Sequence, residues 1–264
     1  MPDNQPAIAV LIGVEAPQPV VHAGVRHRFK PLLGVRNDIN WYEEMLEAGI
    51  EPTSTLPVWR RLEILRLIEP EQTTAGNIKK TLLSSVRRVP PGGLFVLVLV
   101  GHGFQIPAPE NSSEKDGLDE AFAASDGDLV LDDFFGDMWK ELDPTATAVA
   151  FVDTCHASGI PPGIGFAPPA PQIWLDSGPS RIFLSASEEW EQAIEDKRDG
   201  VNRGVMSRAL EDAWRQTDGA RNSYQKLFDE TALTVGLNTG QTVRTRYVGP
   251  DPKILRQPPF SRSR

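Results

Sequence analysis

The sequence contains a single cysteine, Cys155, among its 264 residues. One cysteine excludes an internal disulfide and any zinc site built from several cysteines, so we predict a protein of a reducing compartment, the cytoplasm. Long apolar runs are also missing. The chain opens without basic residues ahead of a short apolar stretch, and no run approaches the ~18 residues that span a membrane. We therefore expect neither a secretion signal nor a membrane partner.

Positive charge is scarce as well. Lysine and arginine number 27 against 36 aspartate and glutamate residues, which gives a net charge of −9 and a pI near 5.0. This balance disfavours a phosphate-binding surface, so we do not expect nucleic acid as a partner. The first apolar segment ends in Gly13-Val14-Glu15, with neither a G-x-G-x-x-G motif nor a Walker-type lysine. A nucleotide-binding α/β protein is therefore a weak alternative.

What the sequence does contain is an alternation of strand and helix patterns. Apolar runs rich in β-branched residues predict buried strands at Ala7 to Ile12, Leu94 to Val100 and Ala146 to Val152, with a weaker one at Arg181 to Ala186. Apolar stripes at helical spacing predict helices over 39–46, 78–89, 135–142, 205–214 and 224–232. We expect the first to end at Gly49, the third to be capped by Asp132 or Asp133, and the last to end before Gly236. We expect an α/β fold with a mostly parallel central sheet between helices.

Two reactive side chains follow predicted strands at their carboxyl ends. His102 lies between Gly101 and Gly103, and the only thiol, Cys155, comes 53 residues later after the next long strand. Because functional groups of such sheets gather beyond the carboxyl ends of the strands, neighbouring strands would bring the imidazole and the thiol together. A histidine can take the proton of a cysteine and later protonate a leaving amine. The pair predicts a cysteine nucleophile with a histidine base.

The local sequences around this pair, VLVGHGFQ and FVDTCHASG, resemble the histidine and cysteine motifs of caspase-like cysteine peptidases, and the second resembles the D-x-C-H-S-G form of metacaspases and bacterial caspase homologues. The likeness extends from about residue 7 to about residue 250. It implies the caspase-hemoglobinase fold in one peptidase domain over 1–250, with a large-subunit-like part over 7–160 and a small-subunit-like part over 180–250. Residues 251–264 are expected to form a tail or linker.

The resemblance also implies a substrate preference. Asp38 and Asp153 match the acidic residues that line the metacaspase pocket for the residue before the cut, and two carboxylates there favour arginine or lysine. Val35 and Val100 stand where many metacaspases have cysteine and serine, so we expect a narrower or more apolar pocket. The alternative is that Asp38 caps a helix and Asp153 tethers a backbone amide.

Basic residues between the two parts suggest self-processing. Lys197, Arg198 and Arg203 lie in a polar stretch, where a peptidase that prefers basic residues could cut its own chain. An ordinary solvated loop is the alternative reading of these charges.

Calcium activation is a further expectation from the resemblance. Asp116, Asp132 and Asp133 correspond to the carboxylates of calcium-dependent family members, and oxygen ligands of this kind suit Ca2+. The acidic residue expected shortly after the cysteine is missing, since residues 161–165 read PPGIG. Helix capping and turn formation explain the same aspartates equally well.

The predicted reaction needs no cofactor. Cys155 would attack a peptide carbonyl, His102 would move the proton, and the backbone amides of Gly103 and Cys155 would hold the oxyanion. The main alternative is a caspase-fold interaction or signalling module without hydrolysis. The sequence leaves the oligomeric state, the physiological substrate and the activating signal open.

Overall fold

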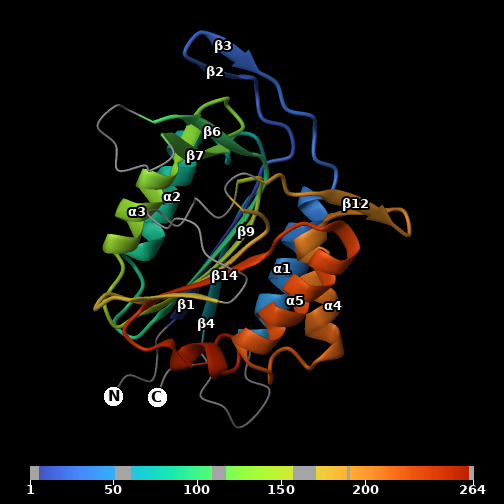
Figure 1. The fold of residues 1–264 in the computed structure, drawn as a ribbon. Coiled ribbons are helices and arrows are strands. Elements are labelled where there is room, and N and C mark those ends of the chain that lie inside the picture. The colour runs from blue at the N-terminus through green and yellow to red at the C-terminus, as the bar shows by residue number, and fades with distance from the viewer. Residues whose placement is uncertain (1–5, 51–60, 109–116, 157–170, 189–190, 262–264) are drawn as a thin grey trace.

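The structure is a computed structural model that describes residues 6–50, 61–108, 117–156, 171–188 and 191–261. A seven-stranded sheet forms its centre, in the order β10-β14-β11-β9-β5-β1-β4 (Figure 1). Its strands are β1 (Pro6–Gly13), β4 (Arg61–Leu67), β5 (Leu94–Val100), β9 (Thr147–Asp153), β10 (Gln172–Leu175), β11 (Ser180–Ser185) and β14 (Arg244–Gly249). β4, β1, β5, β9 and β11 run parallel, and β14 is antiparallel to β11. The predicted α/β architecture is confirmed.

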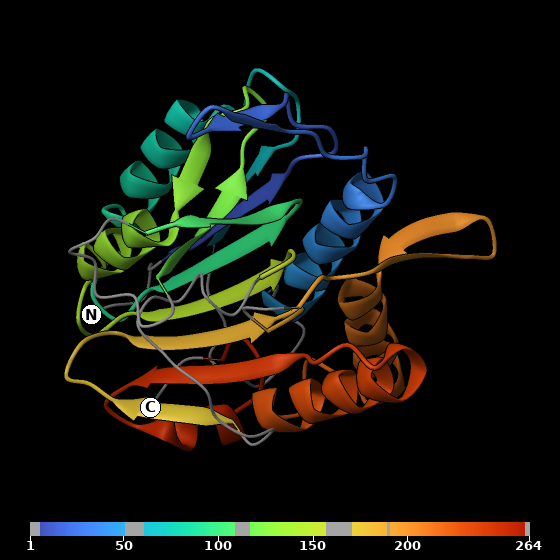
Figure 2. The same cartoon turned by 45° about the horizontal axis from the view of Figure 1, so that its top comes forward.

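The central strands are buried on both faces, as their continuous apolar runs predicted. All seven residues of β5 and all seven of β9 are buried. Such strands need a covering layer on each side of the sheet. One layer is formed by α1 (Val35–Ile50), α4 (Val205–Gln216) and α5 (Tyr224–Thr239), and the other by α2 (Ala75–Val86) and α3 (Asp132–Lys140). Figure 2 shows the two groups of helices on opposite sides of the sheet.

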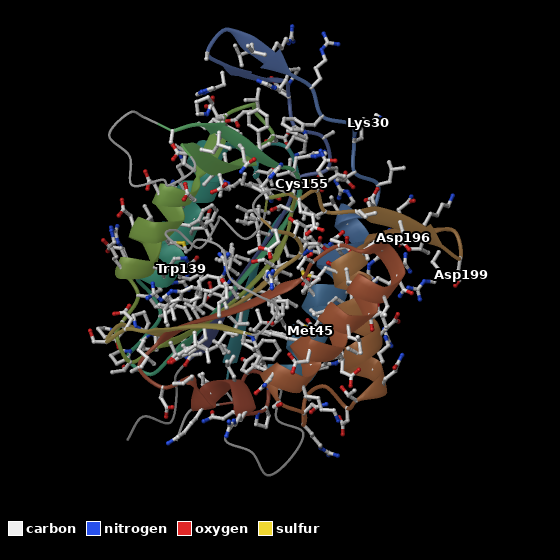
Figure 3. All side chains as sticks on the ribbon, viewed as in Figure 1. Lys30, Met45, Trp139, Cys155, Asp196 and Asp199 are labelled. Atoms are coloured by element: carbon white, nitrogen blue, oxygen red, sulfur yellow. The ribbon has the colours of Figure 1, made fainter. Side chains whose placement is uncertain are left out.

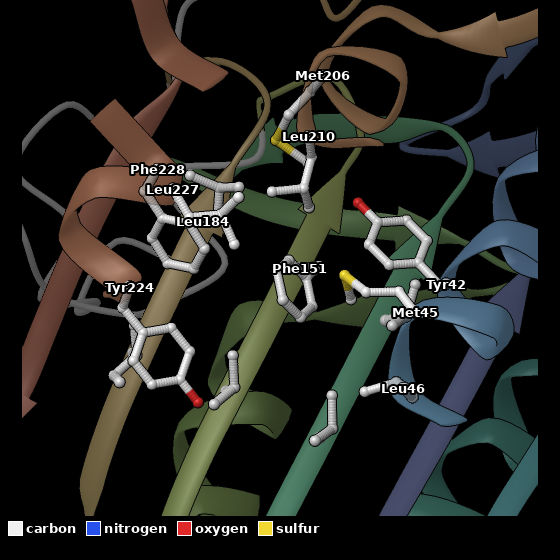
Figure 4. Close-up of a cluster of buried hydrophobic side chains, with 14 of the residues drawn as sticks. Tyr42, Met45, Leu46, Phe151, Leu184, Met206, Leu210, Tyr224, Leu227 and Phe228 are labelled. Carbon is white, nitrogen blue, oxygen red and sulfur yellow. The ribbon is translucent and has the colours of Figure 1, made fainter. Parts of the chain in front are cut away.

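Each face of the sheet has its own apolar core. On the side of α1, α4 and α5, aromatic rings fill the space between helices and strands: Phe151 lies 5.3 Å from Tyr42 and 6.0 Å from Phe228, measured between ring centroids. Figure 4 shows this cluster, in which Met45, Leu210 and Tyr224 also converge on the sheet. On the other side, Trp139 packs against Phe95 and Phe183. The sheet is therefore held rigidly at both faces.

Smaller strand pairs surround the carboxyl end of the central sheet. They are the hairpin of β2 (Val20–His22) and β3 (Val25–His27), the hairpin of β12 (Glu195–Arg198) and β13 (Val201–Gly204), and the sheet of β6 (Gly103–Pro107), β7 (Leu118–Ala123) and β8 (Leu129–Leu131). In Figure 1, β2 and β3 project from the top of the molecule, and β12 projects from its right side. In the part of the chain that is described, no helix has the length and apolar content to cross a membrane.

Several predicted element ends differ from the structure. Gly49 lies inside α1, where a side chain would meet the ring of Phe260, so packing explains the glycine better than a helix end. α5 continues past Gly236 to a cap at Gly240, which adopts the left-handed conformation that favours glycine. α3 has Leu131 at its N-cap without a side-chain hydrogen bond, so neither predicted aspartate caps it.

The segment after β14 packs on the domain instead of extending from it. A short 3-10 helix (Pro252–Arg256) follows β14, and Ile254, Leu255 and Phe260 are buried in the core beside α5. The Tyr224 hydroxyl accepts a hydrogen bond of 2.7 Å from the Phe260 backbone N–H. Residues 251–261, which we expected to form a tail or linker, are therefore part of the folded domain.

Candidate active site

The tips of β5 and β9 bring His102 and Cys155 together. The two strands pair in parallel with Val100 opposite Asp153, so His102 and Cys155 each come two residues after a paired position. The Gly101 N–H donates to the Asp153 carbonyl oxygen at 3.3 Å, which continues the pairing beyond the strands. Gly103 lies so close to the next turn that a Cβ atom there would overlap the carbonyl oxygen of Cys155. The glycine is required because the two tips touch.

A segment from the N-terminal part of the chain orients His102. The Nε2 atom lies 2.7 Å from the backbone carbonyl oxygen of Lys30, and the Phe29 ring centroid lies 4.8 Å from that of the imidazole. Because a carbonyl oxygen only accepts hydrogen bonds, Nε2 carries the proton in the neutral ring, and Nδ1 keeps its lone pair. Burial lowers the pKa of His102, against the opposing effects of the Lys30 carbonyl and Glu195. At neutral pH the ring is an uncharged base.

Cys155 is half-buried beside the segment that precedes β12. Its Sγ atom lies 3.8 Å from the Ala193 carbonyl oxygen, within reach of a weak S–H hydrogen bond. Burial raises the pKa of the Cys155 thiol, which the Ala193 contact opposes. Together with the lowered pKa of His102, this favours a neutral thiol and a neutral imidazole at neutral pH, so the thiol would have to lose its proton before it could act as a nucleophile.

A cavity of about 850 Å3 opens over this pair. His102, Cys155 and Gly103 lie along its wall together with Asp38, Asp153 and Glu195. Val35 and Val100 also line it and are buried, which fits the expectation of apolar groups next to the acidic wall. Figure 3 shows Cys155 at the end of the molecule where Lys30 lies, far from Met45 in the core. The cavity is large enough for several side chains of a bound peptide.

The two predicted pocket aspartates are both buried in the cavity wall. Asp38 accepts hydrogen bonds from Arg203 Nε and, at 2.8 Å, from the Gly204 N–H. Asp153 accepts from the N–H of Ser207 at 3.2 Å and from its hydroxyl at 2.5 Å. Burial and the nearby Asp153 raise the pKa of Asp38 to about 7, and burial raises that of Asp153. The structure thus puts both aspartates on the wall of the cavity that Cys155 also lines.

Comparison with known proteins assigns this arrangement to a family. The sequence profile of the "Metacaspase, peptidase C14 domain" matches residues 8–161, which is more than half of the chain and includes His102 and Cys155. The chain belongs to the metacaspase family. It is 30% identical over 87 residues to Metacaspase-6 and 30% identical over 90 residues to Metacaspase-7, both from Arabidopsis thaliana. These matches cover 33% and 34% of this chain but only 24% and 22% of the plant proteins.

Solved structures support the fold over nearly the whole metacaspase chain. Protein GSU0716 from Geobacter sulfurreducens has a TM-score of 0.70 at 19% identity, and the likeness covers 98% of this chain and 99% of that one. Caspase-1 from Spodoptera frugiperda has a TM-score of 0.53 at 12% identity, covering 93% and 92%. At these identities the likeness shows the caspase fold alone.

The self-processing prediction does not hold for Arg203. This residue was expected in an exposed polar stretch, but it lies on β13 with 7% of its surface exposed and pairs with Asp38 and Glu211. Lys197 and Arg198 are exposed next to the β12–β13 turn, where Arg198 contacts Asp212 at 3.3 Å. A buried arginine in a paired strand is not accessible to a peptidase, so only the other two remain candidates.

The described part of this metacaspase does not contain the expected calcium site. Asp116 lies outside the described residues. Asp132 and Asp133 are the first two residues of α3, one buried and the other exposed, so their side chains face different surroundings. Within the described ranges no group of three or more histidine, cysteine, aspartate or glutamate side chains could hold a metal ion. At the amino end of α3 the two carboxylates interact favourably with the positive end of the helix dipole, which gives them a structural role without a metal ion.

Sequence patterns missed several neighbours of the metacaspase site. Glu195 accepts hydrogen bonds from the N–H groups of Leu33, at 3.0 Å, and Gly34, and so holds the chain that leads from Lys30 into α1. The Lys30 carbonyl belongs to the backbone, which no residue pattern identifies. Ser207 lies on α4 and contacts Asp153, and Arg203 lies on β13 and contacts Asp38. No sequence motif around either residue indicates these contacts.

Proposed function

We propose that this metacaspase is a cysteine endopeptidase that cuts protein chains after arginine or lysine through the His102 and Cys155 dyad. The contact between the tips of β5 and β9 carries this proposal, because it puts the imidazole and the thiol on the wall of one cavity. Family membership supports the peptidase class, and the buried Asp38 and Asp153 support the basic preference.

The reaction begins with a neutral pair. Nδ1 of His102 takes the proton of Cys155 as Sγ attacks the carbonyl carbon of the peptide, and the backbone N–H groups of Gly103 and Cys155 stabilise the oxyanion. The C–N bond then breaks, and the imidazolium gives its proton to the leaving amine. Water attacks the acyl-enzyme, passes a proton to Nδ1 and releases the carboxylic acid with the thiol restored. Lys30 holds the ring in the required tautomer throughout.

A fluorogenic peptide with arginine before the cut tests the proposal. We expect cleavage by the wild type, slower cleavage when citrulline, the uncharged isostere, replaces arginine, and none by Cys155→Ala. Equal turnover by Cys155→Ala would contradict the dyad. No turnover by a folded wild type, with or without calcium, would favour the alternative of a caspase-fold interaction module without hydrolysis.

We also propose that the chain processes itself after Lys197 or Arg198. Both residues are exposed at the end of β12, and the hairpin turn after them contains Asp199 and Gly200 with positive φ angles of 53° and 84°. Incubated wild-type protein should yield fragments that end at one of these residues, identified by intact mass. Cys155→Ala protein should stay whole, and a wild type with Lys197→Gln and Arg198→Gln should not be cut there.

Calcium stimulation is a separate hypothesis that rests on the family. The described residues give it no complete ligand set, so the reaction above has no step through the ion. Peptide cleavage with calcium and with a chelator tests it, and Asp133→Asn is the informative variant because this carboxylate is exposed. If calcium acts through α3, the variant should need a higher calcium concentration than the wild type.

A further inference from the structure

The two aspartates of the acidic wall are not equivalent. Both oxygens of Asp38 already accept hydrogen bonds from consecutive residues of β13, Oδ1 from Arg203 Nε and Oδ2 from the Gly204 N–H. Asp153 accepts only through Oδ2, from Ser207. Among the described residues no arginine, lysine or histidine forms an ion pair with Asp153, whereas Asp38 is ion-paired with Arg203.

The guanidinium of Arg203 is fixed in place by contacts with several elements. Besides Asp38 on α1, it donates through Nη1 to Glu211 Oε2 on α4 at 2.5 Å. Its Cζ atom lies 5.7 Å from the ring centroid of Trp41, in a cation-π arrangement. With 7% of its surface exposed, this arginine is a permanent counter-charge to Asp38 and not a mobile surface group.

A paired charge acts weakly on a ligand compared with an unpaired one. The positive charge of Arg203 at contact distance cancels most of the attraction that Asp38 would exert on a substrate cation. The charge of Arg203 also acts on Asp153, where it opposes the rise in pKa that burial causes, but Asp153 forms no ion pair with it and keeps more of its attraction than Asp38 does. The Gly204 backbone packs closely against the bonded oxygen, since a Cβ atom there would overlap Asp153 Oδ2. Gly204 also lines the cavity. Among the described residues, Oδ1 of Asp153 accepts no hydrogen bond, so it is the oxygen that remains to contact a ligand in the cavity.

We propose that Arg203 is a specificity-determining residue, which neutralises Asp38 so that, of the two aspartates, Asp153 supplies the charge that binds the basic side chain before the cut. Asp38 then serves as a positioning residue that fixes β13 and Gly204. The inference rests on the proposed preference for arginine or lysine, and it assigns the two carboxylates different tasks.

Removing the two charges separately and together tests this division. Asp38→Asn removes the counter-charge of Arg203 on the pocket side and leaves Glu211 as its remaining ion-pair partner, so the guanidinium repels a basic substrate more strongly. We expect kcat/KM for the arginine peptide to fall about tenfold or more, because a buried charge without its partner is costly. In Asp38→Asn with Arg203→Met the repulsion is gone, and kcat/KM should return to within ~3-fold of the wild type.

Asp153→Asn should behave differently. It removes the direct ligand, so the preference for arginine over citrulline should disappear. Arg208→Met is the matched control, because this arginine also lies near β13 but pairs with Asp196, outside the cavity wall. It should keep the wild-type preference. A double variant as poor as Asp38→Asn, or an Asp153→Asn enzyme that keeps its preference, would overturn the inference.

Thermal unfolding tests the pairing without any substrate. The variant with both Asp38→Asn and Arg203→Met should melt above the one with Asp38→Asn alone, because the second change removes a buried guanidinium that has lost its Asp38 partner, while Glu211 keeps its pair with Arg215. Equal or lower melting would contradict the pairing. The proposed function is judged separately, on the wild type and its cleavage of arginine and citrulline peptides, so its failure and the failure of this inference are distinguishable.

Discussion

The backbone carbonyl oxygen of Lys30 lies 2.7 Å from Nε2 of His102, so a segment that precedes the first helix orients the base at the end of β5. The contact decides which ring nitrogen is free to take a proton. The same segment places the Phe29 ring against the imidazole. At its end, the N–H groups of Leu33 and Gly34 donate hydrogen bonds to the Glu195 carboxylate. A loop that supplies no candidate nucleophile is thus part of the geometry of the candidate active site.

Phe29→Ala should weaken this orientation. Without the ring, the segment loses its packing on His102 and Phe104, and the Lys30 carbonyl becomes less well placed. We expect kcat for peptide cleavage to fall about tenfold while KM changes little, because misorientation affects the chemical step more than binding. Val25→Ala, an exposed position on β3 shortly before this segment, is the control. A rise in KM with unchanged kcat would speak against the orienting role.

Gly103→Ala should abolish activity without unfolding the domain. A methyl group there overlaps the carbonyl oxygen of Cys155, so one of the two strand tips has to move. A displacement of about 1 Å at a site of this kind can cost ~100-fold in rate. Gly76→Ala in α2 is the matched control, since its Cβ atom would meet no atom within 4 Å. Circular dichroism should show a folded protein for both variants, and full activity in Gly103→Ala would contradict the close contact.

The reactivity of the single thiol should depend on pH like that of a protonated cysteine. Because burial raises the pKa of Cys155 above its usual range, its alkylation rate should rise about tenfold per pH unit from pH 6 to pH 8. Intact mass after iodoacetamide treatment measures this rate at one site, since the chain has no other cysteine. His102→Gln should show the same slope. A rate independent of pH over this range would indicate a thiolate and imidazolium pair at rest.

Asp153→Asn should stabilise the fold at high pH. Burial raises the pKa of this carboxyl group in the folded state, so the folded protein is penalised when the group ionises. We expect the variant to gain ~1–2 kcal/mol in the free energy of unfolding at pH 8. The gain should shrink as the pH falls through the folded-state pKa, because the wild type then binds a proton. Urea unfolding at several pH values measures it.

The exposed Asp137→Asn provides the control for that measurement. Its carboxylate pairs with Lys140 on the surface, and both side chains are more than three-quarters exposed. The free energy of unfolding should change by less than ~0.5 kcal/mol, with no trend toward stabilisation at high pH. If Asp153→Asn behaved in the same way as this control, the buried carboxyl group would not carry the cost that its surroundings imply.

The sequence alone determined the layers of the fold, and it indicated His102 and Cys155 as the candidate reactive pair. Continuous apolar runs such as Leu94 to Val100 are long enough to mark buried parallel strands, and helical stripes between them require a two-sided cover. His102 and Cys155 were predicted as a pair because each follows such a strand within three residues. The prediction that the first helix ends at Gly49 was wrong. This glycine lies inside the helix and makes space for the ring of Phe260, and the sequence does not distinguish such a glycine from one that ends a helix.

Only the tertiary structure decided how charge is distributed around that pair. Asp38 and Arg203 are separated by 165 residues, and nothing in either local sequence indicates that one accepts a hydrogen bond from the other. The Lys30 carbonyl is equally invisible, since every residue has a backbone oxygen. Strands and helices are visible in the sequence because their patterns repeat over a few residues. The contacts around the pair join residues far apart in the chain, and only the folded structure shows which of them meet.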